Sequence, residues 1–214
     1  MNQLMMREVI FRHPQANNFK LQPVSLTLSA GLYYLLGNNG SGKTTLLKGL
    51  AGIAPVYGGN LRLILDNRPM HIAEYKRYMG YSPQEVAIHP QLTVHQYLKY
   101  IARMRLLPES AIGARIRELI RQFGLSEDAG AKTGQLSVGK KKRLMLAQAM
   151  LADPKLLLVD EPFAHIDIEG QAQMRSWLAE EGQRRIIIAA HHPSDGLAVE
   201  GNVLTLREGR LCGP

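Results

Sequence analysis

The fold of this 214-residue chain is decided by one stretch of sequence, Gly37-Asn38-Asn39-Gly40-Ser41-Gly42-Lys43-Thr44. The stretch matches the pattern G-x-x-x-x-G-K-[ST] in full. The apolar run Leu32 to Leu36 comes before it, which is typical of a central parallel strand. A helical pattern from Lys43 to about Ala54, ended by Pro55, comes after it. A strand, a glycine-rich loop and a helix in this order predict a loop that cradles phosphate groups.

The residue types of this loop follow from what phosphate binding requires. Backbone N–H groups must converge on the phosphate oxygens, and glycine is needed where a Cβ would block that approach or forbid the backbone angles. The first turn of the helix adds unpaired N–H groups and the positive end of its dipole. We expect Lys43 to reach the β- and γ-phosphates of ATP, and the Thr44 hydroxyl to ligate Mg²⁺. The predicted ATP-binding residues are Gly37, Asn38, Asn39, Gly40, Ser41, Gly42, Lys43, Thr44 and Thr45.

A second stretch ends an apolar run with two carboxylates, Leu156-Leu157-Leu158-Val159-Asp160-Glu161-Pro162. Ligands of α/β proteins bind at the carboxyl ends of the strands, so these acids are expected beside the phosphates. Asp160 is predicted to belong to the Mg²⁺ shell. Glu161 is predicted to act as the general base that polarises the attacking water.

The composition of the chain limits the class of protein, its compartment and its partners. Hydrophobic residues make up 45% and charged residues 21% of the chain, which is typical of a globular protein. Its apolar runs are far shorter than the roughly 18 residues that span a bilayer, so no membrane span is expected. Cys212 is the only cysteine, which excludes an intrachain disulfide and favours a reducing compartment. The net charge of +8 suits nucleic acid, an anionic membrane surface or nucleotide phosphates alike, and leaves the partner open.

The order of the remaining patterns predicts the fold class. Strands are predicted at 24–28, 32–36, 61–65, 156–159 and 186–190, and helices at 43–54, 144–151 and 171–181. Between them, a helical pattern runs from about Thr93 to Phe123 with a break at Pro108. Strands that alternate with helices imply an α/β core with a mostly parallel sheet, and the middle segment is expected to form an inserted helical lobe.

The stretch Leu136-Ser137-Val138-Gly139-Lys140-Lys141-Lys142-Arg143 carries a resemblance to a known family. Here the sequence resembles the ATP-binding-cassette (ABC) ATPases, over essentially the whole chain. Their signature is usually written L-S-G-G-Q; Val138 replaces its first glycine and Lys140 its usual glutamine. The resemblance implies a single domain, 1–214, of P-loop NTPase fold. Its RecA-like core has a mostly parallel central sheet, joined by an antiparallel β subdomain and a helical subdomain inserted at about 85–150.

In this family two cassettes pair head to tail, and the signature of one completes the nucleotide site of the other. The resemblance therefore gives a trans-acting role to Leu136, Ser137, Val138, Gly139 and Lys140. Ser137 and the Gly139 N–H would face the γ-phosphate on the partner, and Asp167 resembles the aspartate at the dimer seam. A β-branched Val138 restricts the backbone where glycine is usual, so slow or asymmetric hydrolysis is expected. The basic run Lys140–Arg143 is either a solvated helix face or an attraction for the partner-bound phosphate.

Three further roles come from the resemblance. Gln84, in Tyr81-Ser82-Pro83-Gln84, resembles the glutamine that touches Mg²⁺ or the attacking water. His191 resembles the switch histidine that contacts the γ-phosphate, with His192 as the alternative. Phe11 is the candidate for stacking on adenine, although Phe19 lies nearby and Phe11 also fits a core position.

The function that the resemblance favours is the ATP-binding and hydrolysing subunit of a transporter. Separate membrane permease subunits would carry the transported substrate, which the sequence does not identify. The chain is expected in the cytoplasm, peripheral on the inner face of the cell membrane. The segment 92–105 resembles exporter-type cassettes. One alternative is a soluble ABC-type ATPase that acts on nucleic acid or ribosomes, although a nucleic-acid partner is not expected. Another alternative is a degenerate cassette that binds ATP without useful turnover.

Overall fold

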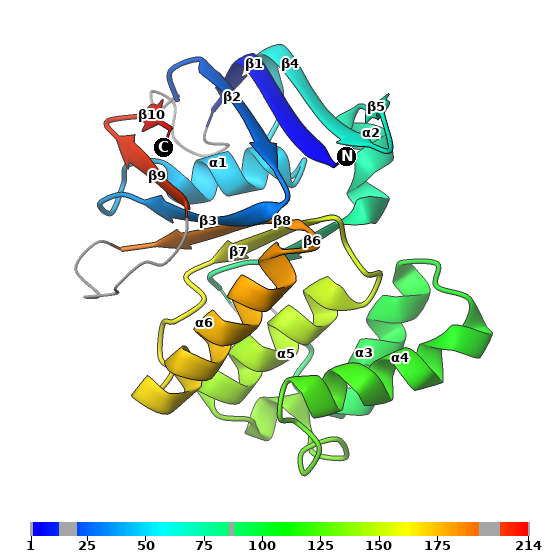
Figure 1. Cartoon of the computed structure of the whole chain (residues 1–214). Helices are drawn as coiled ribbons and strands as arrows, with labels where there is room; N and C mark the ends of the chain where they lie inside the picture. Colours follow the sequence, from blue (N-terminus) through cyan, green and yellow to red (C-terminus); the bar gives the residue numbers. More distant parts are fainter. Residues whose placement is uncertain (1, 13–20, 86–87, 193–201, 214) are drawn as a thin grey trace.

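The computed structural model describes residues 2–12, 21–85, 88–192 and 202–213 (Figure 1). These residues form two β-sheets with one helix between them and four longer helices below the larger sheet. The predicted α/β class with a parallel-rich sheet is confirmed.

The smaller sheet is antiparallel and has the strand order β2-β1-β4-β5. Its strands are β1 (Gln3–Phe11), β2 (Val24–Ser29), β4 (Val56–Leu65) and β5 (Arg68–Met70). Alternating residues of β1, among them Leu4 and Met6, are buried against the rest of the molecule. Asp66 and Asn67 both have positive φ, as the tight turn between β4 and β5 requires. This sheet is the antiparallel part that the family resemblance implies; its strands β1 and β5 were not predicted from pattern.

The larger sheet has six strands in the order β10-β9-β3-β8-β7-β6. They are β3 (Gly31–Leu36), β6 (Met79–Ser82), β7 (Leu156–Asp160), β8 (Ile186–His191), β9 (Asn202–Arg207) and β10 (Arg210–Cys212). All neighbours except β9 and β10 are parallel. Leu36 pairs with His191, and Asp160 pairs with Ala190. The carboxyl ends of β3, β8 and β7 therefore lie side by side at one edge of the sheet.

Helix α1 (Lys43–Leu50) lies between the two sheets (Figure 1). Leu46, Leu47 and Leu50 are buried in the core cluster that joins both sheets to this helix. The helix was expected to continue to about Ala54. It ends at Leu50 instead, because the chain turns at Gly52, whose φ of 66° belongs to the left-handed region that glycine adopts readily. The short helix α2 (Ile72–Tyr75) and the 3₁₀ turn Lys76–Tyr78 follow β5.

The remaining helices cover the other face of the larger sheet (Figure 1). They are α3 (Val94–Met104), α4 (Glu109–Gln122), α5 (Val138–Met150) and α6 (Ile168–Gly182). The predicted break at Pro108 separates α3 from α4. Helix α5 contacts β6 and β7 as well as α3 and α4, so it joins the helical lobe to the sheet. The boundary of the inserted lobe at about 85–150 therefore stays a prediction.

Helices α5 and α6 begin earlier than expected because polar side chains cap them. Ser137 accepts a hydrogen bond from the Lys140 N–H, so α5 begins at Val138 rather than at residue 144. Asp167 accepts one from the Gly170 N–H, so α6 begins at Ile168 rather than at residue 171.

In the described ranges, no helix combines the length and the apolar character that crossing a membrane demands.

Candidate functional site

The loop after β3 has glycine where the backbone geometry requires it. A Cβ on Gly37 would lie 2.5 Å from Ser41 Oγ and 2.6 Å from the Leu206 carbonyl oxygen. Gly40 and Gly42 have φ angles of 78° and 108°, which side-chain-bearing residues rarely adopt. Gly42 is also the N-cap of α1, so the loop leads directly into unpaired N–H groups of the helix.

Lys43, the first residue of α1, folds back over this loop. Its side chain is almost fully buried, and Nζ donates hydrogen bonds to Gly37 O at 2.6 Å and Asn38 O at 3.4 Å. The ammonium group and the free N–H groups of the helix thus gather at the same place. Such a concentration of donors and positive charge suits an anion, and phosphate in particular.

Thr44 and Asp160 form the contact between the loop and the end of β7. Thr44 Oγ1 donates a hydrogen bond to Asp160 Oδ2 at 2.8 Å. Asp160 is 2% exposed, and its Oδ1 has no hydrogen-bond partner among the described residues. Burial raises the pKa of Asp160, although the Thr44 hydroxyl and the charges of Lys43, Lys142 and Lys48 oppose that rise.

These two residues fit a magnesium ion. A hydroxyl and a buried carboxylate with one unused oxygen are hard oxygen ligands of the kind Mg²⁺ prefers. No group of three or more His, Cys, Asp or Glu side chains gathers within the described ranges. Mg²⁺ is usually held by one or two carboxylates together with substrate phosphates.

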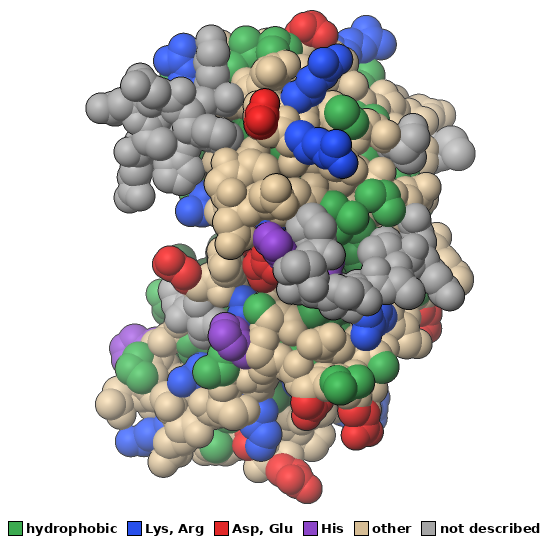
Figure 2. Space-filling view, turned by 90° about the vertical axis from the view of Figure 1, so that its left-hand side faces the viewer, with side chains coloured by type: hydrophobic (Ala, Val, Ile, Leu, Met, Phe, Trp, Pro, Cys, Tyr) green, Lys and Arg blue, Asp and Glu red, His purple; other side chains and the backbone are tan. Residues whose placement is uncertain are grey.

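Glu161 lies directly after β7, at the mouth of an open groove. Its φ is 53°, and its N–H donates to Ala190 O at 3.0 Å, so the chain leaves the strand through a left-handed turn. The groove is lined by Asn39, Gln84, Glu161, Phe163, Ala164, His165, Gln171 and His192. Figure 2 shows histidine and acidic side chains close together on this face of the molecule, where its surface is hollowed. The structure therefore brings the predicted residues Gln84 and Glu161 to one groove.

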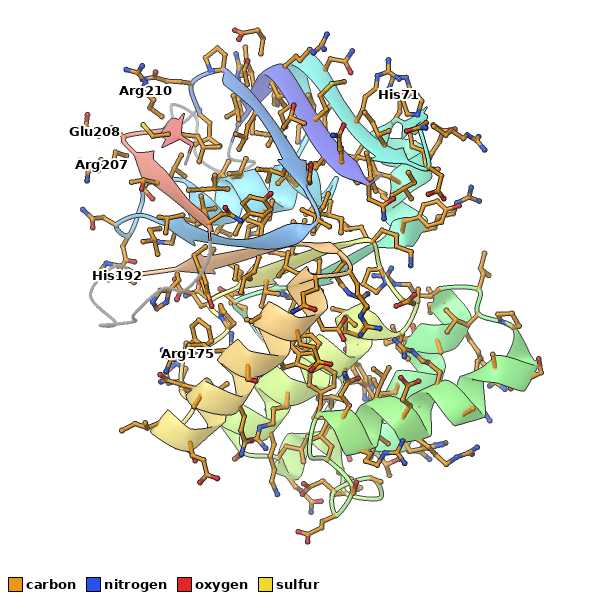
Figure 3. The ribbon with its side chains drawn as sticks, viewed as in Figure 1. His71, Arg175, His192, Arg207, Glu208 and Arg210 are labelled. Carbon is orange, nitrogen blue, oxygen red and sulfur yellow. The ribbon has the colours of Figure 1, made fainter. Side chains whose placement is uncertain are left out.

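The two histidines at the end of β8 lie in different environments. His191 is the last residue of β8 and is almost fully buried, with its ring edge-on to Phe163 at 5.5 Å between centroids. His192 lines the groove beside Glu161 and lies at the carboxyl end of β8 (Figure 3). Both are near the predicted phosphate site. The assignment of the switch to His191 stays a prediction.

Phe11 does not occupy the position that the sequence suggested. It is the last residue of β1 and is completely buried in the core beneath α1. A Cβ on Gly49 of α1 would lie 2.1 Å from Phe11 Cδ1, so the ring fills the space beside that glycine. The prediction that Phe11 stacks on adenine is wrong, because its ring is enclosed by core side chains; the core alternative holds. Phe19 lies outside the described residues.

A second groove borders the phosphate loop on its other side. It is lined by residues 36–41 of the loop and by Thr205, Leu206, Arg207 and Glu208 of β9 and the turn after it. Figure 3 shows Arg207 and Glu208 at the same side of the molecule as His192. Sequence reasoning did not single out this segment, because nothing in its pattern shows that β9 lies next to β3.

The signature residues lie at the first turn of α5. Leu136 is buried, Ser137 caps the helix, and Val138 is 50% exposed at the first helical position. Ser137, Val138, Gly139 and Lys140 line a groove together with Arg143, His165, Ile166 and Asp167. Among the described residues this groove shares only His165 with the groove of Glu161. Within one chain, the signature and the predicted general base therefore border different grooves.

Sequence reasoning missed Lys142. It is 5% exposed, and its Nζ donates to Gln84 O at 2.5 Å. Burial lowers the pKa of Lys142, and the negative charges of Asp160 and Glu161 oppose that change. A lysine inside a basic run has no feature in the sequence that separates it from its solvated neighbours.

Tyr81, on β6, belongs to the surroundings of Asp160. Its hydroxyl is buried without a hydrogen-bond partner among the described residues. Burial raises the pKa of Tyr81, and the negative charge of Asp160 raises it further. Charges act more strongly on one another in such a buried environment than in water.

Comparison with known proteins gives consistent matches. The family model described as ABC transporter matches residues 21–164. The sulfate/thiosulfate import ATP-binding protein CysA of Nocardia farcinica is 31% identical over 94% of this chain and 61% of its own length. The spermidine/putrescine import ATP-binding protein PotA of Shigella boydii is 32% identical over 88% of this chain and 50% of its own length. The chain thus spans little more than half the length of these curated relatives.

A solved structure matches most of both chains. It is CbiO1 from Clostridium perfringens, described as part of the ABC transporter complex CbiONQ. The TM-score is 0.79 at 26% identity, and the match covers 98% of this chain and 86% of the other. The similarity therefore extends over the two sheets and the helical lobe together.

Proposed function

The chain belongs to the ABC transporter family, and we propose that it binds ATP with Mg²⁺ and hydrolyses it to drive transport through separate membrane subunits. The observation that carries this proposal is the hydrogen bond between Thr44 and Asp160, beside buried Lys43 and the groove of Glu161. This hydrogen bond brings together Lys43, which suits phosphate, the pair Thr44 and Asp160, which suits Mg²⁺, and a carboxylate in the groove, Glu161, which suits proton transfer.

Each residue then has a separate task. Lys43 and the N–H groups of the loop hold the β- and γ-phosphates, and Thr44 and Asp160 hold Mg²⁺. When bound, Mg²⁺ neutralises part of the phosphate charge. Glu161 accepts the proton of the attacking water, and the side chain of Gln84 orients that water from the same groove. The groove beside Arg207 has room for the sugar end of the nucleotide.

The partner we propose is a second ABC cassette, arranged head to tail. The groove of Ser137 and the groove of Glu161 share only His165 among the described residues, so each site would be completed by the other copy. At the seam, Ser137 and the Gly139 N–H would face the γ-phosphate that the second cassette binds. Asp167, which lines the groove of Ser137, lies near this surface.

Separate permease subunits and a place on the cytoplasmic face of the membrane are also part of the proposal. The names of the relatives above are those of import ATP-binding proteins, and CbiO1 is described as part of a transporter complex. These import names give no support to the exporter-type resemblance of segment 92–105. The alternative of an ATPase acting on nucleic acid rests on the net charge of +8 alone.

The test is Mg²⁺-dependent release of phosphate by the purified chain. Replacing Glu161 by Gln removes the base and keeps the shape, so turnover should fall by about 10²–10⁴-fold while ATP binding is retained. A matched control is Glu169→Gln, since Glu169 is exposed in the first turn of α6. Full activity of Glu161→Gln would refute the general base.

A second variant tests the phosphate loop separately. Lys43→Ala removes the ammonium that lies over Gly37 O, so we expect weaker ATP binding, measured by titration calorimetry. An unchanged ATP affinity would refute the assignment of the phosphate loop.

A further inference from the structure

The three consecutive lysines near the start of α5, Lys140, Lys141 and Lys142, have three different partners. Lys140 forms an ion pair with Asp128 at 2.9 Å, and Lys141 Nζ donates to Gly134 O at 3.4 Å. Both of these partners lie on the segment before α5. Lys142 instead reaches across to the segment after β6 and donates to Gln84 O at 2.5 Å. Only this lysine of the three is buried.

The surroundings of Lys142 connect it to the end of β7. The negative charges of Asp160 and Glu161 both act on its ammonium group. In return, the positive charge of Lys142 acts on Asp160. Lys142 therefore lies behind the two carboxylates, on a helix whose first turn belongs to the signature.

This position is unfavourable for stability. Burying a cation costs free energy unless charge and hydrogen bonds compensate it, and burial lowers the pKa of Lys142 accordingly. An apolar side chain of the same length would avoid this cost. The stability of the fold therefore does not explain a lysine at this place.

We propose that Lys142 is a positioning residue for ATP hydrolysis: its ammonium ties the backbone of Gln84 to the signature helix and sets a positive charge behind Asp160 and Glu161. This inference rests on the proposed function. The bond to Gln84 O fixes where the glutamine side chain enters the groove of Glu161. The same ammonium places a positive charge near the two carboxylates.

The hydrogen bond from Lys142 to Gln84 O also joins two segments that act on different nucleotide sites. Ser137 and Val138, one turn earlier on α5, would serve the site of the second cassette. Gln84 serves the site of its own chain. A displacement of α5 on pairing is therefore transmitted through Lys142 to Gln84, so that each copy senses whether its signature is engaged.

The test compares Lys142→Met with wild type. Methionine keeps the unbranched side chain as far as Cε but has no charge and no donor. We expect kcat to fall about tenfold or more, as loss of a charged hydrogen bond predicts, while the ATP Kd stays within about twofold. The melting temperature should stay the same or rise, because the cost of burying the cation is removed. Lys142→Arg should recover part of kcat.

The matched control is Lys141→Met, which removes the neighbouring charge from the same helical turn and should leave kcat within about twofold. Hydrogen exchange at the amides of Ser82, Gln84 and Glu85 gives a readout that does not depend on activity. These amides should exchange faster in Lys142→Met than in wild type or Lys141→Met.

Two results would overturn the inference. One is a kcat within about twofold of wild type in Lys142→Met, together with unchanged exchange at the amides of Ser82, Gln84 and Glu85. The other is a fall in kcat that is matched by equal losses of ATP affinity and melting temperature, which describes a structural residue only. If wild type itself does not hydrolyse ATP, the proposed function fails, and the exchange comparison still decides whether Lys142 tethers Gln84.

Discussion

The hydroxyl of Thr44 donates a hydrogen bond to Asp160 Oδ2 at 2.8 Å, across 116 residues of sequence. Thr44 is the second residue of α1 and Asp160 is the last residue of β7, and β8 lies between β7 and β3 in the sheet. This single contact brings together the two stretches that sequence reasoning had assigned to phosphate and to Mg²⁺. It also leaves Asp160 Oδ1 without a hydrogen-bond partner among the described residues.

Replacing Thr44 by Val should weaken the use of Mg²⁺. Valine has the same shape but no hydroxyl, so one ligand of the ion and the donor to Asp160 are lost together. The Mg²⁺ concentration at half-maximal ATPase activity should rise about tenfold, which corresponds to one lost charged hydrogen bond. ATP affinity in EDTA should not change. Thr27→Val, on the exposed side of β2, is the control; an unchanged Mg²⁺ requirement in Thr44→Val would remove Thr44 from the metal site.

Replacing Asp160 by Asn should stabilise the fold without Mg²⁺ at neutral pH. Burial raises the pKa of Asp160 above its ordinary value of 3.8, so the folded state binds the proton more tightly than the unfolded state. This tighter proton binding stabilises the fold below pH 3.8. The stabilisation is lost as the pH rises through the pKa that Asp160 has in the folded state. At pH 7 the ionised form therefore destabilises wild type.

The measurement is the melting temperature in EDTA. Asp160→Asn should melt about 2–4 °C above wild type at pH 7 for each 1 kcal/mol gained, and the difference should shrink toward pH 4. Added Mg²⁺ and ATP should stabilise wild type more than the variant. A variant that melts below wild type at pH 7 would show that Asp160 is held by contacts that favour its charge.

The sequence predicted the parts of the site that local patterns encode. The buried runs before Gly37 and Asp160 read as strands, and the glycines stand where φ is positive or a Cβ would collide. The burial of Phe11 and the contact of Lys142 were not predictable in this way. Each depends on a segment far away in the chain, and neither periodicity nor motif spacing carries that information. The earlier end of α1 is a local effect, because the chain turns at Gly52.

Phe11→Leu should lower stability without affecting nucleotide binding. The ring is enclosed beneath α1 and beside Gly49, so a smaller side chain leaves a gap that costs about 1 kcal/mol. The melting temperature should fall by about 2–4 °C, and the ATP Kd should stay within about twofold of wild type. The opposite outcome, a weaker ATP affinity at an unchanged melting temperature, would restore Phe11 as the residue that stacks on adenine.

Val138 is the departure from the usual signature with the clearest expected effect. The sequence argument was that a β-branched residue restricts the backbone where glycine is usual. In the structure Val138 is the first residue of α5, with helical backbone, and its side chain is half exposed. The backbone therefore does not need glycine here. What valine adds is an isopropyl group beside the N–H groups that would face the γ-phosphate on the second cassette.

Val138→Gly should therefore raise kcat, by about three- to tenfold if one N–H contact to the phosphate is recovered. It should lower the melting temperature slightly, because glycine costs up to about 1 kcal/mol in a helix. Val138→Ala is the matched variant: it removes two methyl groups without that cost, and its kcat should lie between wild type and Val138→Gly. If kcat is the same in all three, the isopropyl group does not obstruct the phosphate. A lower kcat in Val138→Gly would mean instead that valine packs against the second cassette and holds the pair together.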